Sequence, residues 1–176
     1  MHTAYIGLGS NLGDSLQLLE EAWLELGNHP EIQLISLASP YFSKPMDMVS
    51  ENWFVNSAGC IQTALNAADL LAFLHETEKK FGRKRSNSTV GYADRSLDLD
   101  LLLYDNVVTE KSGPVILPHP RLHERLFVLM PLDELGPDLC HPLLNRTMAT
   151  LLSDLKARSS NQEVQRVQWD ESFDFR

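Results

Sequence analysis

The sequence predicts an α+β fold of the ferredoxin-like class, a mainly antiparallel sheet with helices packed on at least one face. Segments with strand patterns alternate with two amphipathic helical segments in the order strand, helix, strand, strand, helix, strand. That order is the split β-α-β arrangement of ferredoxin-like folds. The chain has 176 residues, which is enough for one domain built around a single hydrophobic core.

A turn that contains glycine separates the first strand from the first helix. Residues 3–8 form an apolar run that predicts a strand, and the glycines in segment 9–13 end it. Asp14, with Gln17 three residues later, has the pattern of a capping box. Apolar residues then recur at helical spacing up to Gly27, so we expect a helix that ends there.

Two strands and a second helix follow. Residues 33–42 and 53–63 predict the second and third strands, joined by the polar loop 44–52. Asn66 is placed to cap a helix with apolar residues at helical spacing, and Gly82 is placed to end it.

The last strand of this unit is segment 97–104, which reads Leu-Asp-Leu-Asp-Leu-Leu-Leu-Tyr and follows the charged loop 83–94. Pro118-His119-Pro120 then predicts a non-helical entry into a short helix that extends through Met130. Residues 146–158 have the apolar spacing of a final helix.

We therefore expect one domain over residues 1–158. Residues 159–176 are polar but end in aromatic side chains, and we expect them to be a C-terminal extension whose role the sequence does not indicate.

Asp98 and Asp100 are the most informative residues of the chain. In a strand they point to the same face, with Cα atoms roughly 7 Å apart. Two such carboxylates can bind one Mg²⁺ ion or a pair of ions ~3.5–4 Å apart. A divalent cation would offset the cost of burying the acids and would in turn bind phosphate. The alternative is an ordinary antiparallel strand whose acids are solvated on its wet face.

Basic residues gather around the acidic segment although the formal net charge is −9. The negative charge argues against general nucleic-acid binding. The clustered residues are Arg83, Lys84, Arg85 and Arg95 before the acids, and Arg121 and Arg125 after them. Because arginine binds phosphate oxygens through a bidentate fork, this clustering favours a phosphate site over scattered surface charge.

Composition and cysteine content predict a cytoplasmic protein with no membrane partner. No apolar run approaches the ~20 residues that span a bilayer. The first residues lack the basic-then-apolar pattern of a secretory signal. Cys60 and Cys140 have no metal-ligand spacing, so we expect both to be reduced and buried.

The chain resembles one enzyme family in three blocks. They are Ala-Tyr-Ile-Gly-Leu-Gly-Ser-Asn-Leu-Gly over 4–13, Arg-Ser-Leu-Asp-Leu-Asp-Leu-Leu over 95–102, and 117–132, which contains Leu-Pro-His-Pro-Arg and Arg-Leu-Phe-Val-Leu-Met-Pro-Leu. In order and spacing they resemble 6-hydroxymethyl-7,8-dihydropterin pyrophosphokinase of folate biosynthesis over residues 2–158. The resemblance implies transfer of pyrophosphate from ATP to the pterin hydroxymethyl group, release of AMP, and two Mg²⁺ ions.

The resemblance also implies the site residues. Asp98 and Asp100 would hold both ions, and they would act with Arg83 and Arg95 as the catalytic residues. The pterin would be bound by Phe54 and Phe127 on its two faces, by Asn56 at its edge, and by the loop around Ser43 to Met46. ATP would be surrounded by Glu78, Arg83, Arg85, Arg95, His119 and Arg125, with Leu101 near the adenine. The partners would be these two small molecules, and we expect a monomer.

The chain departs from the family pattern at one turn. The family usually has Gly-Pro-Arg before the acidic strand, whereas this chain has Ala93-Asp94-Arg95. The loop over 86–94 is slightly long for the family, and Tyr92 takes the place of a loop tryptophan.

Two other classes of function stay open from the residues alone. A nucleotidyltransferase also uses Asp-x-Asp on a strand, but it releases pyrophosphate rather than AMP. A non-catalytic ferredoxin-like binding module would leave the two acids solvated and would consume no ATP.

Overall fold

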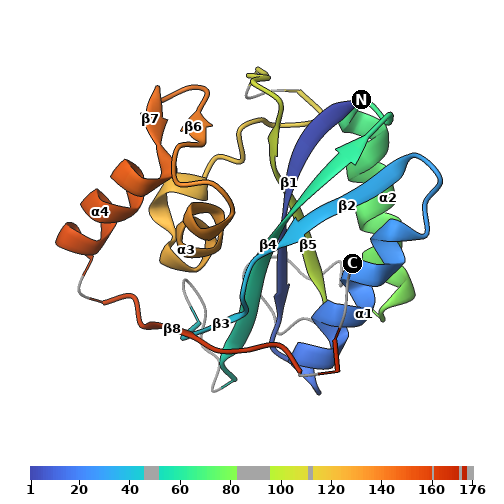
Figure 1. Cartoon of the computed structure of the whole chain (residues 1–176), viewed down its shortest axis with the longest axis horizontal. Coiled ribbons are helices and arrows are strands. Elements are labelled where there is room, and N and C mark those ends of the chain that lie inside the picture. Colours follow the sequence, from blue (N-terminus) through green and yellow to red (C-terminus); the bar gives the residue numbers. More distant parts are fainter. Residues whose placement is uncertain (46–51, 83–95, 111–112, 160, 171, 174–176) are drawn as a thin grey trace.

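A computed structural model of the chain describes residues 1–45, 52–82, 96–110, 113–159, 161–170 and 172–173. Its centre is a six-stranded sheet (Figure 1). The strands of this sheet are β1 (His2–Ser10), β2 (Ile32–Leu37), β3 (Tyr41–Ser43), β4 (Phe54–Thr63), β5 (Asp98–Tyr104) and β8 (Val164–Arg166). The helices are α1 (Ser15–Gly27), α2 (Ala67–Lys80), the short 3-10 helix η1 (Leu122–Glu124), α3 (Leu126–Leu135) and α4 (Met148–Arg158). Strands β6 (Cys140–His141) and β7 (Arg146–Thr147) form a separate hairpin.

The strand order is β5-β1-β4-β3-β8, and β2 also pairs with β4. Each strand pair in the described part of the chain is antiparallel. Helix α1 connects β1 to β2, and α2 connects β4 to β5. The predicted antiparallel sheet and the split β-α-β order are therefore confirmed.

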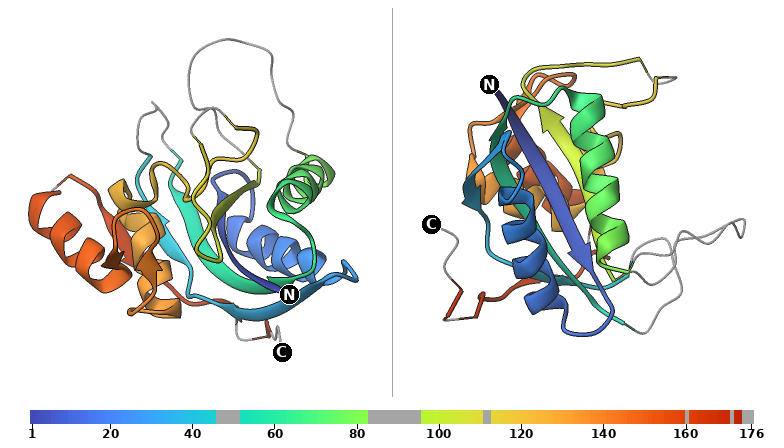
Figure 2. Two further views of the ribbon diagram at one scale, coloured as in Figure 1. Left: turned by 90° about the horizontal axis from the view of Figure 1, so that it is seen from above. Right: turned by 90° about the vertical axis from the view of Figure 1, so that its right-hand side faces the viewer.

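Helices cover both faces of the sheet. The right-hand view of Figure 2 shows α1 and α2 side by side over one face, and Figure 1 shows α3 and α4 on the opposite side. Each pair of helices has its own apolar cluster, one around Trp23 and Leu70, the other around Leu102 and Leu129. Gly59 lets α1 approach the sheet closely, because a Cβ there would lie 2.2 Å from Cζ3 of Trp23.

The predicted helix starts are confirmed by their caps. The Asp14 side chain accepts a hydrogen bond from the Gln17 amide at 3.2 Å. The Asn66 side chain accepts from the amides of Ala68 and Asp69, both at 3.0 Å. These caps satisfy amide groups that have no partner inside the first turn of a helix.

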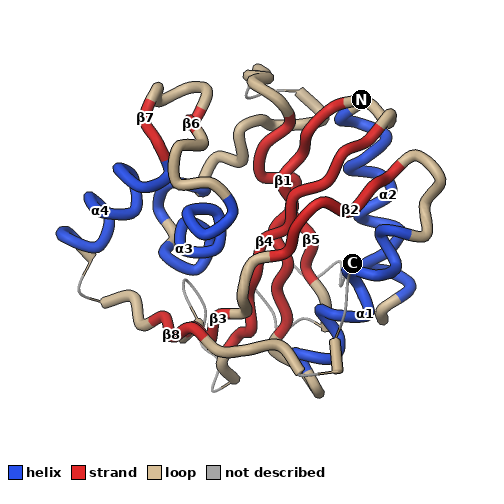
Figure 3. The backbone as a smooth tube through the Cα atoms, viewed as in Figure 1, coloured by secondary structure: helices blue, strands red, loops and turns tan. Residues whose placement is uncertain are grey.

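The continuous strand expected over 33–42 is wrong, because the structure divides it into β2 and β3. Figure 3 shows a loop between them. The amide of Ala38 donates to the Ala58 carbonyl oxygen at 2.9 Å, and the amide of Ser39 donates to the Glu134 carboxylate at 3.1 Å. Pro40 has no amide hydrogen to continue the strand. Long-range partners therefore interrupt a segment whose local pattern is that of one strand.

The helix expected to end at Met130 continues through Pro131 to Leu135, and η1 precedes it. A proline inside a helix removes one backbone hydrogen bond. The buried side chains of Leu129 and Leu132 pack in the second apolar cluster and keep this segment helical.

The described residues of the C-terminal segment return to the sheet. Strand β8 pairs with β3, and the Trp169 indole N–H donates to the Ala38 carbonyl oxygen at 2.9 Å. Trp169 and Phe173 pack against the first apolar cluster. Among the described residues, no helix has the length and apolar character needed to cross a bilayer.

Candidate active site

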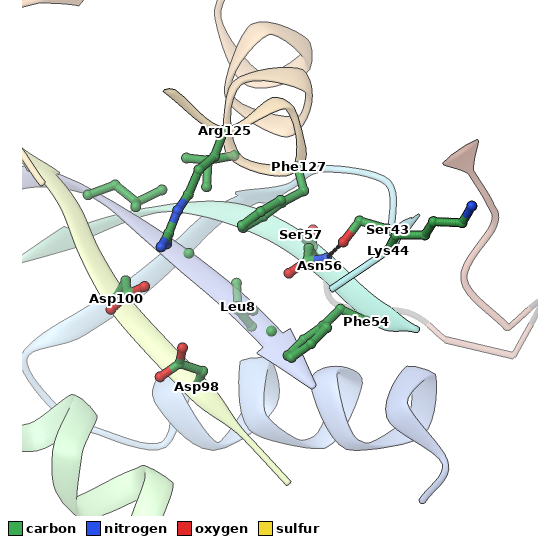
Figure 4. Close-up of a pocket in the computed structure, with 14 residues that line it drawn as sticks. Leu8, Ser43, Lys44, Phe54, Asn56, Ser57, Asp98, Asp100, Arg125 and Phe127 are labelled. Atoms are coloured by element: carbon green, nitrogen blue, oxygen red, sulfur yellow. Dashed lines mark hydrogen bonds between the residues drawn. The ribbon is translucent and has the colours of Figure 1, made fainter. Parts of the chain in front are cut away.

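A cleft opens between the sheet and the start of α3, with a volume of about 710 Å³ that includes space open to solvent (Figure 4). Its lining comes from four strands, from helix α3, and from the residues next to β3 and α3: Gly7, Leu8, Gly9, Ser43, Lys44, Phe54, Asn56, Ser57, Asp98, Asp100, Leu102, Arg125, Phe127 and Val128. Segments far apart in the chain thus meet at one site.

The floor of the cleft places two carboxylates opposite two glycines. Asp98 pairs with Gly9 and Asp100 with Gly7 across β5 and β1. Directly opposite residues share a face of the sheet, so the expectation that both acids point the same way is confirmed. A Cβ on Gly9 would lie 3.2 Å from Oδ1 of Asn56 and 3.9 Å from Cβ of Asp98. Glycine therefore keeps the space beside the acids open.

This arrangement fits a divalent cation that is shared with a ligand. Asp98 and Asp100 are half-exposed and both line the cleft. The described residues contain no group of three or more potential metal-binding side chains. Mg²⁺ is commonly held by one or two carboxylates together with substrate phosphates. The two acids are suited to that kind of site rather than to a closed protein cage.

The other end of the cleft is aromatic with a polar edge. In Figure 4 the rings of Phe54 and Phe127 lie on either side of Asn56. The Asn56 amide donates to Oγ of Ser43 at 2.9 Å, and both side chains are buried. That bond orients the amide group of Asn56. A flat heterocycle can stack between such rings and hydrogen-bond through its edge.

Arg125 connects the aromatic and acidic ends of the cleft. Its guanidinium carbon lies 5.5 Å from the ring centroid of Phe127, a cation–π distance. Figure 4 shows the side chain extending from the start of α3 toward Asp100. The guanidinium is thus directed to the region where an anion bound above the acids would lie.

His119 lies close enough to the acidic end of the cleft to be affected by its charges. Burial is the main cause that lowers its pKa to about 4, with a further contribution from Arg125, while Asp98 acts in the opposite direction. Its Nδ1 accepts a hydrogen bond from the Arg121 amide at 3.3 Å. The neutral ring therefore carries its proton on Nε2 and can donate a hydrogen bond without carrying charge.

Glu78 lies on the other side of the acidic strand from the cleft. Its side chain is 1% exposed, and its Oε1 accepts a hydrogen bond from the Leu99 amide at 2.8 Å. Leu99 stands between Asp98 and Asp100. The Glu78 carboxylate is therefore buried and binds the backbone of β5.

Leu101 also lies outside the cleft, in the apolar cluster under α1 and α2, and its neighbour Leu102 lines the cleft instead. A contact of Leu101 with adenine stays a prediction. Other predicted site residues lie outside the described part of the chain: Met46, Arg83, Arg85, Tyr92 and Arg95, with the turn residues Ala93 and Asp94.

Sequence reasoning did not assign several residues that line the cleft, among them Gly7, Gly9 and Leu102. One signal was present, because Gly7-Leu8-Gly9 has the same period of two as the acidic pair. Pairing the two motifs requires the register of β1 and β5, which local sequence does not reveal.

Comparison with known sequences finds one family. Residues 5–137 match the model of 7,8-dihydro-6-hydroxymethylpterin-pyrophosphokinase (HPPK). A 2-amino-4-hydroxy-6-hydroxymethyldihydropteridine pyrophosphokinase from Bacillus subtilis (strain 168) is 40% identical over 134 residues, which cover 75% of this chain and 77% of that protein. The bifunctional protein FolKE from Lactococcus lactis subsp. lactis is 36% identical over 135 residues, covering 77% of this chain but 38% of that protein.

Solved structures show the same fold. The wild-type HPPK-DHPS structure from Plasmodium falciparum superposes with a TM-score of 0.67 at 14% identity, covering 89% of this chain and 41% of that chain. A second HPPK-DHPS structure, in complex with substrates, gives 0.69 at 11% identity and covers 87% of this chain and 43% of that one. This chain thus spans less than half of the FolKE protein and less than half of each of these two solved chains. From the family match and the 40% identity to the Bacillus subtilis protein, the chain belongs to the 7,8-dihydro-6-hydroxymethylpterin-pyrophosphokinase family.

Proposed function

We propose that the chain transfers the β,γ-pyrophosphoryl group of ATP to 6-hydroxymethyl-7,8-dihydropterin and releases AMP, as a step of folate biosynthesis. One observation carries the proposal: a single cleft holds an acidic pair at one end and an aromatic pocket with a fixed amide at the other. An ATP-consuming transfer to a flat heterocycle needs both ends. Family membership supports the same reaction.

The aromatic end would bind the pterin. Phe54 and Phe127 would stack on its two faces, and Asn56, held by Ser43, would hydrogen-bond its edge. Met46 is proposed to contribute to the same pocket. The fixed amide would select a heterocycle with matching donors and acceptors, because a mismatched edge leaves buried polar groups unpaired.

The acidic end would bind the phosphates. Asp98 and Asp100 would hold two Mg²⁺ ions, which would neutralise phosphate charge and help to deprotonate the attacking hydroxyl group. Arg125 would bind phosphate oxygens through its guanidinium, and His119 would donate from Nε2. Further ATP contacts are proposed for Glu78, Arg83, Arg85, Arg95 and Leu101.

The transfer needs positioning more than covalent chemistry from the protein. The hydroxymethyl oxygen attacks the β-phosphorus of ATP. The bond from that phosphorus to the oxygen that bridges to the α-phosphate breaks, and AMP leaves with that oxygen. The hydroxyl proton is released to solvent. The arginines would stabilise the charge that develops on the phosphate oxygens.

The experiment is to incubate the protein with ATP, Mg²⁺ and the reduced pterin and to identify the nucleotide product. AMP formation that depends on both pterin and Mg²⁺ is the expected result. Release of pyrophosphate would indicate a nucleotidyltransferase, and unchanged ATP would indicate a binding module. We also propose that the protein is cytoplasmic and that its active species is a monomer. Sedimentation of the active protein would test the oligomeric state.

A further inference from the structure

Helix α3, which carries Phe127 and follows Arg125, begins without a cap from its own sequence. Arg125 occupies the N-cap position and its side chain makes no capping hydrogen bond. Arginine has no acceptor atom that could make one. The first amides of a helix have no partner within the helix, so the Leu126 amide needs an acceptor from elsewhere.

Gln162, from the C-terminal segment, supplies that acceptor. Its Oε1 accepts a hydrogen bond from the Leu126 amide at 2.8 Å. Its Nε2 donates to the carbonyl oxygen of Glu124 at 2.9 Å. One side-chain amide therefore binds the backbone on both sides of Arg125. The side chain of Gln162 is half-buried, and its bond to the Leu126 amide is partly shielded from water, whereas its bond to Glu124 is exposed.

The residues that follow Gln162 bind the opposite wall of the cleft. The Lys44 amide donates to the Glu163 carbonyl oxygen at 3.3 Å. Val164 pairs with Ser43, whose Oγ accepts from Asn56. Figure 1 shows β8 running beside β3 below α3. The C-terminal segment thus contacts both walls of the cleft within three residues.

We infer that Gln162 is a positioning residue for the cleft: by bonding the backbone on both sides of Arg125, it fixes Arg125 and Phe127 relative to the wall formed by β3. The inference rests on the proposed function for its effect on substrate, and on geometry alone for its effect on the backbone. The matched family region ends at residue 137, so this role belongs to a part of the chain beyond that match.

The test compares Gln162→Ala with Gln165→Ala in the full-length protein. Gln165 lies in the same segment, but its side chain is exposed and its backbone pairs with Phe42 of β3. Gln162→Ala is expected to raise the KM for the pterin about fivefold, the scale of one lost hydrogen bond, while kcat stays within about twofold. Gln165→Ala is expected to change neither.

A conservative variant separates positioning from general stability. Gln162→Glu keeps an acceptor for the Leu126 amide but loses the donor to Glu124, and a carboxylate is favourable near a helix N-terminus. Its KM should therefore fall between those of the wild type and Gln162→Ala. If both Gln162 variants keep the wild-type KM, or if Gln165→Ala raises it equally, the inference is wrong.

Amide hydrogen exchange at Leu126 supplies a readout that needs no substrate. Exchange there should be faster in Gln162→Ala than in the wild type and unchanged in Gln165→Ala. Unchanged exchange in Gln162→Ala would overturn the inference. A wild-type protein that forms no AMP would instead overturn the proposed function, and the Leu126 exchange rate would then decide alone whether Gln162 holds this backbone.

Discussion

The two faces of β1 and β5 differ in what they contribute. On one face Ile6 and Leu99 are buried against α1 and α2 in the first apolar cluster. On the other face Gly7 and Gly9 lie opposite Asp100 and Asp98, and the surface is open as the floor of the cleft. The same strands therefore stabilise the fold with one set of side chains and offer chemistry with the alternate set. Substitutions of neighbouring residues in these strands should therefore change either the stability of the fold or the activity, and leave the other unchanged.

The largest effect is expected at the acids. Asp98→Asn or Asp100→Asn should lower kcat/KM for AMP formation by ~10³-fold, the scale of lost transition-state charge stabilisation. The free energy of unfolding should change by no more than about 0.5 kcal/mol, because the side chains are half-exposed and no apolar packing is lost. Steady-state kinetics and urea unfolding measure the two quantities. Asp138→Asn, which changes an exposed acid far along the chain, is the control. If Asp138→Asn lowered kcat/KM as much as the variants of Asp98 and Asp100, the division of faces would be contradicted.

The neighbouring residue on the opposite face should behave in the reverse way. Leu99 is 1% exposed and belongs to the first apolar cluster. Leu99→Ala should lower the free energy of unfolding by about 3 kcal/mol, through lost burial and the cavity left behind. At a temperature where the variant stays folded, kcat should remain within about threefold of the wild type on this reasoning. A loss of activity as large as that of Asp100→Asn would mean that the faces are not independent.

A pair of glycines sharpens the comparison further. A Cβ on Gly59 would lie 2.2 Å from the Trp23 ring, whereas a Cβ on Gly9 would meet Oδ1 of Asn56 at 3.2 Å. Gly59→Ala should therefore destabilise the fold by about 2 kcal/mol through overpacking. Gly9→Ala should instead raise the KM for the pterin about tenfold, because the added methyl group enters the cleft. Thermal unfolding measures the stability of both variants, and substrate titration measures their KM for the pterin. The prediction is wrong if Gly9→Ala is the less stable of the two.

Sequence patterns predicted which residues of β5 lie on each face of the sheet, but not the residues from other strands that lie beside them. Alternation alone places Asp98 and Asp100 on one side of a strand. The third family block contains Phe127, and the resemblance to the family implies Asn56. The glycines opposite the acids follow only from the register of β1 and β5. The break between β2 and β3 depends on partners such as Ala58 and Glu134, far away in sequence. Such long-range contacts leave no local periodicity, and the same holds for the bonds of Gln162.

The smallest effect is expected in the hairpin next to α4. The buried His141 ring accepts hydrogen bonds at Nδ1 from the amides of Leu143 and Leu144, at 3.3 and 3.2 Å. Burial lowers the pKa of His141 below its usual value, with a further contribution from nearby His123. The ring is therefore neutral in the folded protein, and protonation would remove the acceptor that both amides use.

The direction of the pH dependence follows from that lowered pKa. His141 takes up its proton more readily in the unfolded chain, whose histidine pKa is about 6.5. Its contribution to stability is complete above that pH and is lost as the pH falls toward the lower pKa of the folded state. Urea unfolding between about pH 7.5 and 5 should show a smaller loss of stability in His141→Asn than in the wild type, since asparagine offers a non-titrating acceptor. If the stability of His141→Asn and of the wild type depends on pH in the same way, the acid sensitivity belongs to groups other than His141.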